Sequence, residues 1–132
     1  MVLIVEDDPL SRRALQSLIA ANGYACRAVP SAEDALEVLK ARNNEPEICL
    51  IDIDLPGMNG LQLLQQLHKT HPRIPCSLMS ANDHDLARSA GGRSVPFFPK
   101  PLNLNRLFTF LQDSAKCVSP APSFNRFSAG GR

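Results

Sequence analysis

Five short apolar runs recur along the chain, and the segments between them carry apolar residues at helical spacing. The first run, Val2–Val5, is apolar at every position, which is typical of a strand covered on both faces. The runs predict strands at Val2–Val5, Tyr24–Val29, Ile48–Ile51, Cys76–Met79 and Val95–Phe98. The chain is therefore expected to alternate strand and helix.

Capping residues mark the starts of the helices between these runs. A polar side chain just before an apolar repeat can accept a backbone N–H that the first helical turn leaves unpaired. Helix starts are predicted in this way at Asp8 with Pro9, at Ser31 with Asp34, near Asn59 and at Asn103. A short, weaker helix is expected from Asp83 to Ala90, closed by Gly91-Gly92.

The alternation predicts an α/β fold. Short connections between strand and helix favour a parallel sheet with helices on both faces. Five strands are too few for an eight-stranded barrel, so we expect an open, doubly wound, flavodoxin-like sheet in the order 2-1-3-4-5.

The composition indicates one ordinary globular domain. The chain has 132 residues, of which 44% are hydrophobic and 20% charged. From Ser114 on, the chain is rich in Ser, Ala, Pro and Gly and has no apolar period. We therefore expect a domain over residues 1–113 and a disordered tail over residues 114–132.

Charge, cysteine spacing and the first residues bear on location and partners. The net charge of +1 argues for neither nucleic acid nor membrane as a direct partner. The four cysteines form no C-x-x-C pair, which favours reduced thiols. The chain opens on VLIV without a secretory signal, and no apolar run approaches the ~20 residues of a membrane span. A cytoplasmic protein is expected.

Carboxylates gather at one edge of the predicted sheet. Strand 1 runs into Glu6, Asp7 and Asp8, and strand 3 runs into Asp52 and Asp54. In an open α/β sheet, ligands bind beyond the carboxyl ends of the strands at the switch point, which here lies between strands 1 and 3. Crowded carboxylates disfavour joint ionisation, and Mg²⁺ prefers oxygen ligands. The pattern therefore predicts a Mg²⁺ site, with Asp8 acting as a helix cap.

Two further polar side chains are expected at the same edge. Strand 4 ends at Ser80, whose hydroxyl can bond an oxyanion, and strand 5 leads to Lys100, which brings an ammonium. Carboxylates, a metal site, a hydroxyl and a lysine together are typical of phosphoryl transfer.

These pieces resemble the receiver domain of two-component response regulators. The shared motifs are VLIVEDD, the aspartate within IDIDLPGMNG, the hydroxyl in LMSA and the lysine in FFPKP, in order and at family spacing. The resemblance covers essentially all of residues 1 to 113. Each motif alone is weak evidence, whereas four in register are strong evidence.

The resemblance implies a role for each acid. Asp52 would be the phosphoacceptor, attacking a phosphohistidine on a sensor histidine kinase or a small phosphodonor. Asp7 would ligate Mg²⁺ directly and Glu6 through water, with Asp52 also at the metal and Asp54 offering its backbone carbonyl.

The resemblance also implies a switch. Ser80 and Lys100 would contact the phosphoryl oxygens, and Phe97 would fill the aromatic switch position. The bond between Lys100 and Pro101 would be cis, a state far commoner before proline than elsewhere.

The expected function is a phosphorylatable signalling switch, not a turnover enzyme. Its readout would be binding of a downstream protein or onward transfer to a histidine phosphotransfer protein, as a monomer or a weak phosphorylation-dependent dimer. One alternative is a haloacid-dehalogenase-like phosphatase, although that family places its Asp-x-Asp after the first strand and follows it with threonine. Another is a degenerate receiver that only binds partners. The chain could also belong to a larger regulator.

Overall fold

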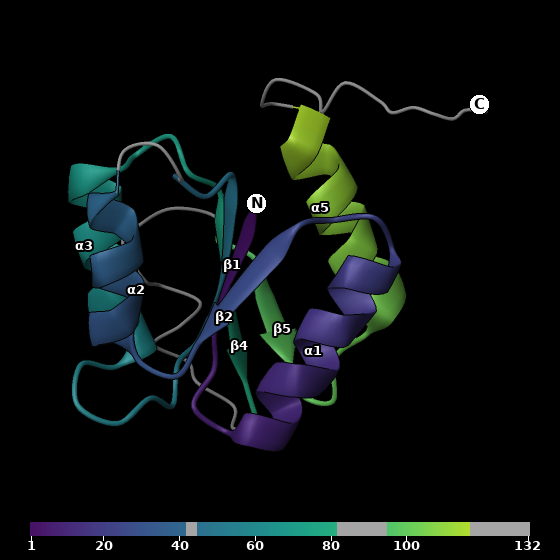
Figure 1. Ribbon diagram of the computed structural model, residues 1–132, viewed down its shortest axis with the longest axis horizontal. Helices are drawn as coiled ribbons and strands as arrows, with labels where there is room; N and C mark the ends of the chain where they lie inside the picture. The colour runs from purple at the N-terminus through teal and green to yellow at the C-terminus, as the bar shows by residue number, and fades with distance from the viewer. Residues whose placement is uncertain (42–44, 82–94, 117–132) are drawn as a thin grey trace.

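A five-stranded parallel sheet forms the centre of the molecule, in the order β2-β1-β3-β4-β5 (Figure 1). The computed structural model describes residues 1–41, 45–81 and 95–116. The strands are β1 (Val2–Val5), β2 (Cys26–Val29), β3 (Ile48–Asp52), β4 (Cys76–Ser80) and β5 (Phe97–Pro99). The predicted fold class and strand order are confirmed.

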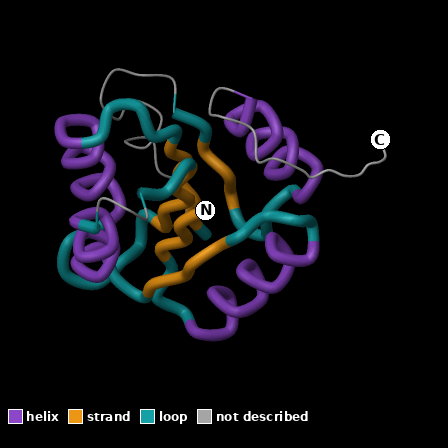
Figure 2. The backbone as a smooth tube through the Cα atoms, turned by 45° about the horizontal axis from the view of Figure 1, so that its top comes forward, coloured by secondary structure: helices purple, strands orange, loops and turns teal. Residues whose placement is uncertain are grey.

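Helices cover both faces of the sheet. They are α1 (Pro9–Ala21), α2 (Ala32–Lys40), α3 (Gly60–Thr70) and α5 (Leu104–Lys116). The helices α1 and α5 lie on one face, and α2 and α3 lie on the other, as Figures 1 and 2 show from two directions. The helix predicted from Asp83 to Ala90 lies outside the described residues.

The four described helices begin where their capping residues predicted. In each case the predicted side chain accepts a backbone N–H from three residues further on. The pairs are Asp8 with Ser11 at 2.8 Å, Ser31 with Asp34 at 3.0 Å, Asn59 with Gln62 at 2.9 Å and Asn103 with Arg106 at 3.1 Å. The backbone N–H of Ser11 lowers the pKa of Asp8, because it stabilises the carboxylate.

The sheet separates two apolar clusters. In β1, Leu3 and Val5 face the cluster under α2 and α3, whereas Val2 and Ile4 face the cluster under α1 and α5. All four are nearly inaccessible to solvent, and fully burying a large apolar side chain stabilises a fold by about 1.5–3 kcal/mol. Both faces of the central strands are therefore core, as the continuous apolar run predicted.

Four strands differ from their predicted limits, although β3 and β4 only end one residue later, at Asp52 and Ser80. The strand β2 begins two residues later than expected, because the backbone N–H of Tyr24 donates to the Ile19 carbonyl at 3.3 Å and so closes the end of α1. The strand β5 covers Phe97–Pro99 instead of Val95–Phe98, in register with Leu78 to Ser80 of β4.

The last helix runs three residues past the predicted domain boundary at residue 113. The helix α5 continues to Lys116, and Ser114 is only 8% exposed. The last turn of α5 therefore belongs to the folded domain, which the low apolar content of that turn did not reveal. The rest of the predicted tail, residues 117–132, lies outside the described residues.

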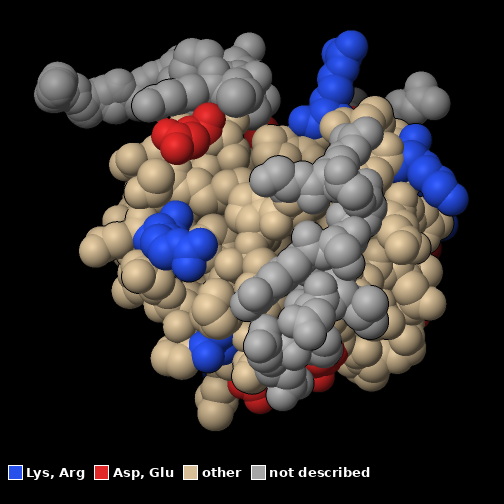
Figure 3. All heavy atoms as spheres, turned by 180° about the vertical axis from the view of Figure 1, so that it is seen from behind, with Lys and Arg blue, Asp and Glu red and all other residues tan. Residues whose placement is uncertain are grey.

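Charged side chains are dispersed over the described surface. On the face seen in Figure 3, Lys and Arg side chains stand singly and are separated by uncharged surface. The exposed pair of Lys40 and Glu37, at 3.1 Å, is of a kind worth about 0–1 kcal/mol. Stability therefore rests mainly on the two apolar clusters.

The described helices are short compared with a lipid bilayer. The longest, α1 and α5, have 13 residues each, whereas a membrane span needs about 20 apolar residues. Within the described ranges, no helix has the length and hydropathy to cross a membrane.

Candidate functional site

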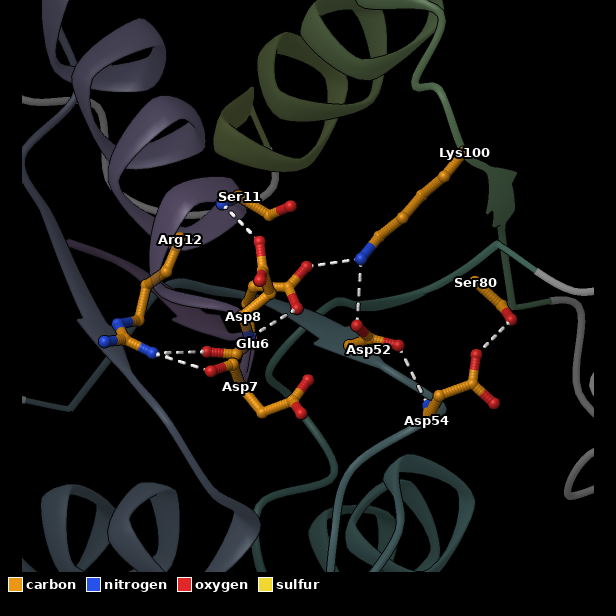
Figure 4. A network of polar contacts seen from close by, with 9 residues as sticks. All are labelled: Glu6, Asp7, Asp8, Ser11, Arg12, Asp52, Asp54, Ser80 and Lys100. Carbon is orange, nitrogen blue, oxygen red and sulfur yellow. Dashed lines mark hydrogen bonds and ion pairs between the residues drawn. The ribbon is translucent and has the colours of Figure 1, made fainter.

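Three carboxylates meet at the carboxyl ends of β1 and β3. One oxygen atom from each of Glu6, Asp7 and Asp52 lies within 4.8 Å of the other two (Figure 4). The register explains the meeting, because Val5 pairs with Ile51 and the next residue of each strand carries the acid. The acid cluster predicted at the switch point is confirmed.

Burial raises the free-energy cost of keeping these carboxylates charged. Glu6 is 2% exposed and Asp52 is 3% exposed, while Asp7 lies at the surface. Burial raises the pKa of Glu6 because it disfavours the charged carboxylate. The hydrogen bond from Lys100 lowers this pKa and the negative charge of Asp52 raises it, and the net shift is upward. The cluster therefore favours a cation beside it.

Lys100 supplies one such cation. Its ammonium donates to Glu6 Oε1 and, at 2.9 Å, to Asp52 Oδ2. Burial alone would lower the pKa of Lys100, but these two hydrogen bonds outweigh it and raise the pKa. The peptide bond from Lys100 to Pro101 is cis, as the family resemblance implied.

Both carboxylate oxygens of Asp52 are held. Oδ1 accepts the backbone N–H of Asp54 at 2.9 Å, and Oδ2 accepts the Lys100 ammonium. Figure 4 shows these donors approaching from the loop after β3 and from the end of β5. The carboxylate of Asp52 is thereby fixed in one orientation.

Ser80 lies beside this group at the end of β4. It is fully buried, and its hydroxyl donates to Asp54 Oδ2 at 2.6 Å (Figure 4). The family resemblance assigned Asp54 only its backbone carbonyl. The structure places that carboxylate against Ser80, at the point where the predicted phosphoryl group would need a donor.

Arg12 is a supporting residue that the sequence analysis did not identify. Its guanidinium group, on the first turn of α1, donates to the carbonyls of Glu6 at 3.0 Å and Asp7 at 3.2 Å (Figure 4). These contacts hold the backbone that carries two of the three carboxylates. No sequence signal distinguishes Arg12 from its neighbour Arg13, because only the fold brings one of them to the loop.

Gly60 is a second supporting residue that was missed. A Cβ at this position would lie 2.2 Å from the backbone oxygen of Asp52, so only glycine lets α3 begin directly beneath that residue. Glycine is a poor helix former, and its place at the predicted start of a helix was a usable signal.

The two phenylalanines of β5 face opposite sides of the sheet, as their alternation predicted. Phe97 is half-buried and packs against the cluster under α2 and α3. Phe98 is 3% exposed and lies in the cluster under α1 and α5. Phe97 is thus partly packed already in this structure.

The acid cluster fits a hard divalent cation. Its donors are carboxylate oxygens on adjacent strands, within 4.8 Å of one another, and two of them are buried. Mg²⁺ prefers such oxygen ligands and completes its octahedron with water. The exposed position of Asp7 leaves one side of the cluster open to solvent.

Comparison with known proteins decides the family. Residues 2–112 match the family model of the response regulator receiver domain. The chain belongs to this family. Because receiver domains are parts of signalling regulators, the phosphatase alternative is set aside.

Curated relatives of this receiver domain are longer response regulators. The DNA-binding transcriptional regulator NtrC of Escherichia coli (strain K12) is 32% identical over 114 residues, which are 85% of this chain and 24% of that protein. The response regulator MprA of Mycobacterium sp. (strain KMS) is 28% identical over 90% of this chain and 52% of its own length. The receiver domain therefore spans about a quarter to a half of these relatives.

Solved structures agree with this assignment. The receiver domain of nitrogen regulatory protein C, solved in solution in its apo form, has a TM-score of 0.78 at 30% identity, covering 89% of this chain and 95% of that one. The receiver domain of NtrX from Brucella abortus has a TM-score of 0.76 at 27% identity, covering 88% and 98%.

Proposed function

We propose that this receiver domain is the phosphoacceptor switch of a two-component phosphorelay. It takes a phosphoryl group onto Asp52 from a sensor histidine kinase or a histidine phosphotransfer protein. The observation that carries the proposal is the fixed carboxylate of Asp52, which is buried, oriented through both oxygens and placed beside Lys100. A structural aspartate does not require burial, two oriented oxygens and a neighbouring ammonium all at once.

The transfer follows from the chemistry of a carboxylate nucleophile. An oxygen of Asp52 attacks the phosphorus, the phosphorus–nitrogen bond to the donor imidazole breaks, and its electron pair stays on the imidazole nitrogen, which then takes a proton. The product is an acyl phosphate on Asp52, and attack by water later returns carboxylate and inorganic phosphate. Lys100, already at 2.9 Å from Asp52, would balance the charge of the phosphoryl oxygens.

Mg²⁺ would be held by the same acids. Asp7 and Asp52 would bind it through their carboxylates, Glu6 through water, and Asp54 through its backbone carbonyl. When bound, Mg²⁺ would offset negative charge on the phosphoryl oxygens. Glu6, Asp7 and Asp52 already present their oxygens to one another, so little movement of these side chains is needed.

A hollow beside the site supports docking of the protein that donates the phosphoryl group. It has a volume of about 350 Å³, reaches from Glu6 and Lys100 to Leu15 and Leu18 of α1, and includes Leu104 at the start of α5. Leu104 is 44% exposed. An apolar hollow bordered by charged groups is of a kind that protein contacts use.

Phosphorylation would be read out by a downstream protein partner. Ser80 and Phe97 would respond to the new charge, and the surface around β5 would then bind its partner differently. We propose a monomer, or a weak dimer that depends on phosphorylation, with no direct contact to nucleic acid.

The test is intact mass measurement with acetyl phosphate and Mg²⁺. The wild-type protein should gain one phosphoryl group, and Asp52→Asn should gain none. Lys100→Ala should react more slowly at the same Mg²⁺ concentration, because the ammonium beside Asp52 is lost. A phosphoryl group mapped to another carboxylate in Asp52→Asn would contradict the assignment. Absence of phosphoryl uptake in the wild type would favour a degenerate receiver that only binds partners.

A further inference from the structure

The hydrogen bond between Ser80 and Asp54 joins a hydroxyl that the proposed function uses to a carboxylate to which it gives no role. The Ser80 hydroxyl donates to Asp54 Oδ2 at 2.6 Å, across 26 residues of sequence. Asp54 stands two residues after Asp52, and its backbone N–H also bonds the Asp52 carboxylate. The contact therefore lies directly beside the reacting group (Figure 4).

A serine hydroxyl carries one proton to donate, whereas an ionised carboxylate and a phosphoryl oxygen can only accept. Ser80 therefore cannot fully serve Asp54 and a phosphoryl group on Asp52 at the same time. Since Ser80 is 0% exposed, its proton has no bulk water as a substitute acceptor. A bond from this hydroxyl to a phosphoryl oxygen therefore requires that its bond to Asp54 Oδ2 be given up.

The exposure of Asp54 lowers the free-energy cost of moving the Ser80 hydroxyl from Asp54 to the phosphoryl group. Asp54 is exposed, so its carboxylate can be hydrated once Ser80 leaves it. Ser80 would go from one charge-assisted hydrogen bond to another, and such bonds are about twice as strong as neutral ones. Breaking the hydrogen bond from Ser80 to Asp54 still costs free energy, and this cost disfavours the state in which Ser80 contacts the phosphoryl group.

We infer that the Asp54 carboxylate is a competing acceptor that holds Ser80 in its resting position and thereby sets how readily a phosphoryl group at Asp52 is read out. Asp54 acts here as a positioning residue through its side chain, in addition to the backbone carbonyl proposed for the metal. This inference rests on the proposed function, because it takes Ser80 as the donor to the phosphoryl group.

The test is a double-mutant cycle on the affinity for beryllofluoride in the presence of Mg²⁺, with beryllofluoride standing in for the phosphoryl group. The four proteins are wild type, Asp54→Ala, Ser80→Ala and the double variant. In the Ser80→Ala background, Asp54→Ala reports only the loss of a negative charge near Asp52. In the protein that keeps Ser80, Asp54→Ala reports the charge effect and the release of the Ser80 hydroxyl together.

The factor by which Asp54→Ala tightens beryllofluoride binding should be about tenfold larger when Ser80 is present, because a hydrogen bond to a charged group is lost from the resting state. Asp54→Asn, which keeps a neutral acceptor, should lie between wild type and Asp54→Ala. Without beryllofluoride, amide resonances at Ser80 and Phe97 should shift in Asp54→Ala toward their positions in the liganded wild type.

Equal factors in the two backgrounds, with no shift of these resonances, would overturn the inference while leaving phosphorylation of Asp52 intact. If wild type took up no beryllofluoride, or if Asp52→Asn took it up equally well, the proposed function itself would fail and the inference with it. The two failures are therefore distinguishable in one set of titrations.

Discussion

Asp7 is the exposed member of the acid cluster, and its carboxylate lies within 4.8 Å of two buried carboxylates that share Lys100. One ammonium cannot offset three negative charges. The third charge is therefore unfavourable without a further cation, by an amount of order 1 kcal/mol for groups near a surface.

We expect Asp7→Asn to raise the melting temperature slightly in the absence of Mg²⁺ and to remove most of the stabilisation that added Mg²⁺ produces. The first effect follows from relief of like charge, and the second from loss of a ligand oxygen. Thermal unfolding with and without Mg²⁺ measures both.

Asp8→Asn is the matched control for this prediction. It removes the same charge one residue further on, and asparagine still caps α1. Its response to Mg²⁺ should therefore remain near that of the wild type. An unchanged response in Asp7→Asn would show that Asp7 does not hold the metal.

At the scale of single elements, α5 shows where the folded domain ends. The buried side chains Leu107 and Leu111 attach this helix to the sheet, and Ser114 continues the same buried stripe. The last turn up to Lys116 therefore contributes helical hydrogen bonds and contact with the domain.

A chain cut after Asp113 should be less stable than a chain cut after Lys116, by about 1–3 kcal/mol. This range follows from the net loss of about two helical hydrogen bonds, at about 0.5–1.5 kcal/mol each, because the end of a helix frays. Chemical denaturation of the two truncated proteins measures the difference. Equal stability would place the end of the domain at residue 113 after all.

At the scale of the whole molecule, Ser80 and Phe97 connect the site to the far side of β5. Ser80 pairs with Pro99 across the sheet, and Phe97 pairs with Leu78 of the same strand as Ser80. A movement of Ser80 toward Asp52 would therefore displace its neighbours in β4 and the paired residues of β5.

Beryllofluoride with Mg²⁺ should change the amide and ring resonances of Phe97 in the wild type. Ser80→Ala should bind beryllofluoride more weakly and lose most of this change, because no short donor then draws the end of β4 inward. Phe98, on the opposite face, is the internal control and should respond less in both proteins. The same response of Phe97 in both proteins would make Phe97 a core residue without a switch role.

Sequence alone determined most elements of this protein and the edge of the sheet where its acidic side chains gather. Helix starts were predictable because a cap joins residues three positions apart, so both partners lie in one short segment of the sequence. The meeting of Glu6, Asp7 and Asp52 was predictable because the winding of an open sheet brings the carboxyl ends of its strands to one edge.

Tertiary structure alone decided which partners these side chains take. Lys100 reaches Glu6 across 94 residues, and Ser80 reaches Asp54 across 26. The choice of Arg12 over Arg13 and the need for glycine at position 60 likewise depend on how α1 and α3 approach the sheet. Residue types and spacing determine which groups arrive at the edge, whereas the competition among donors and acceptors is settled by distances that exist only after packing.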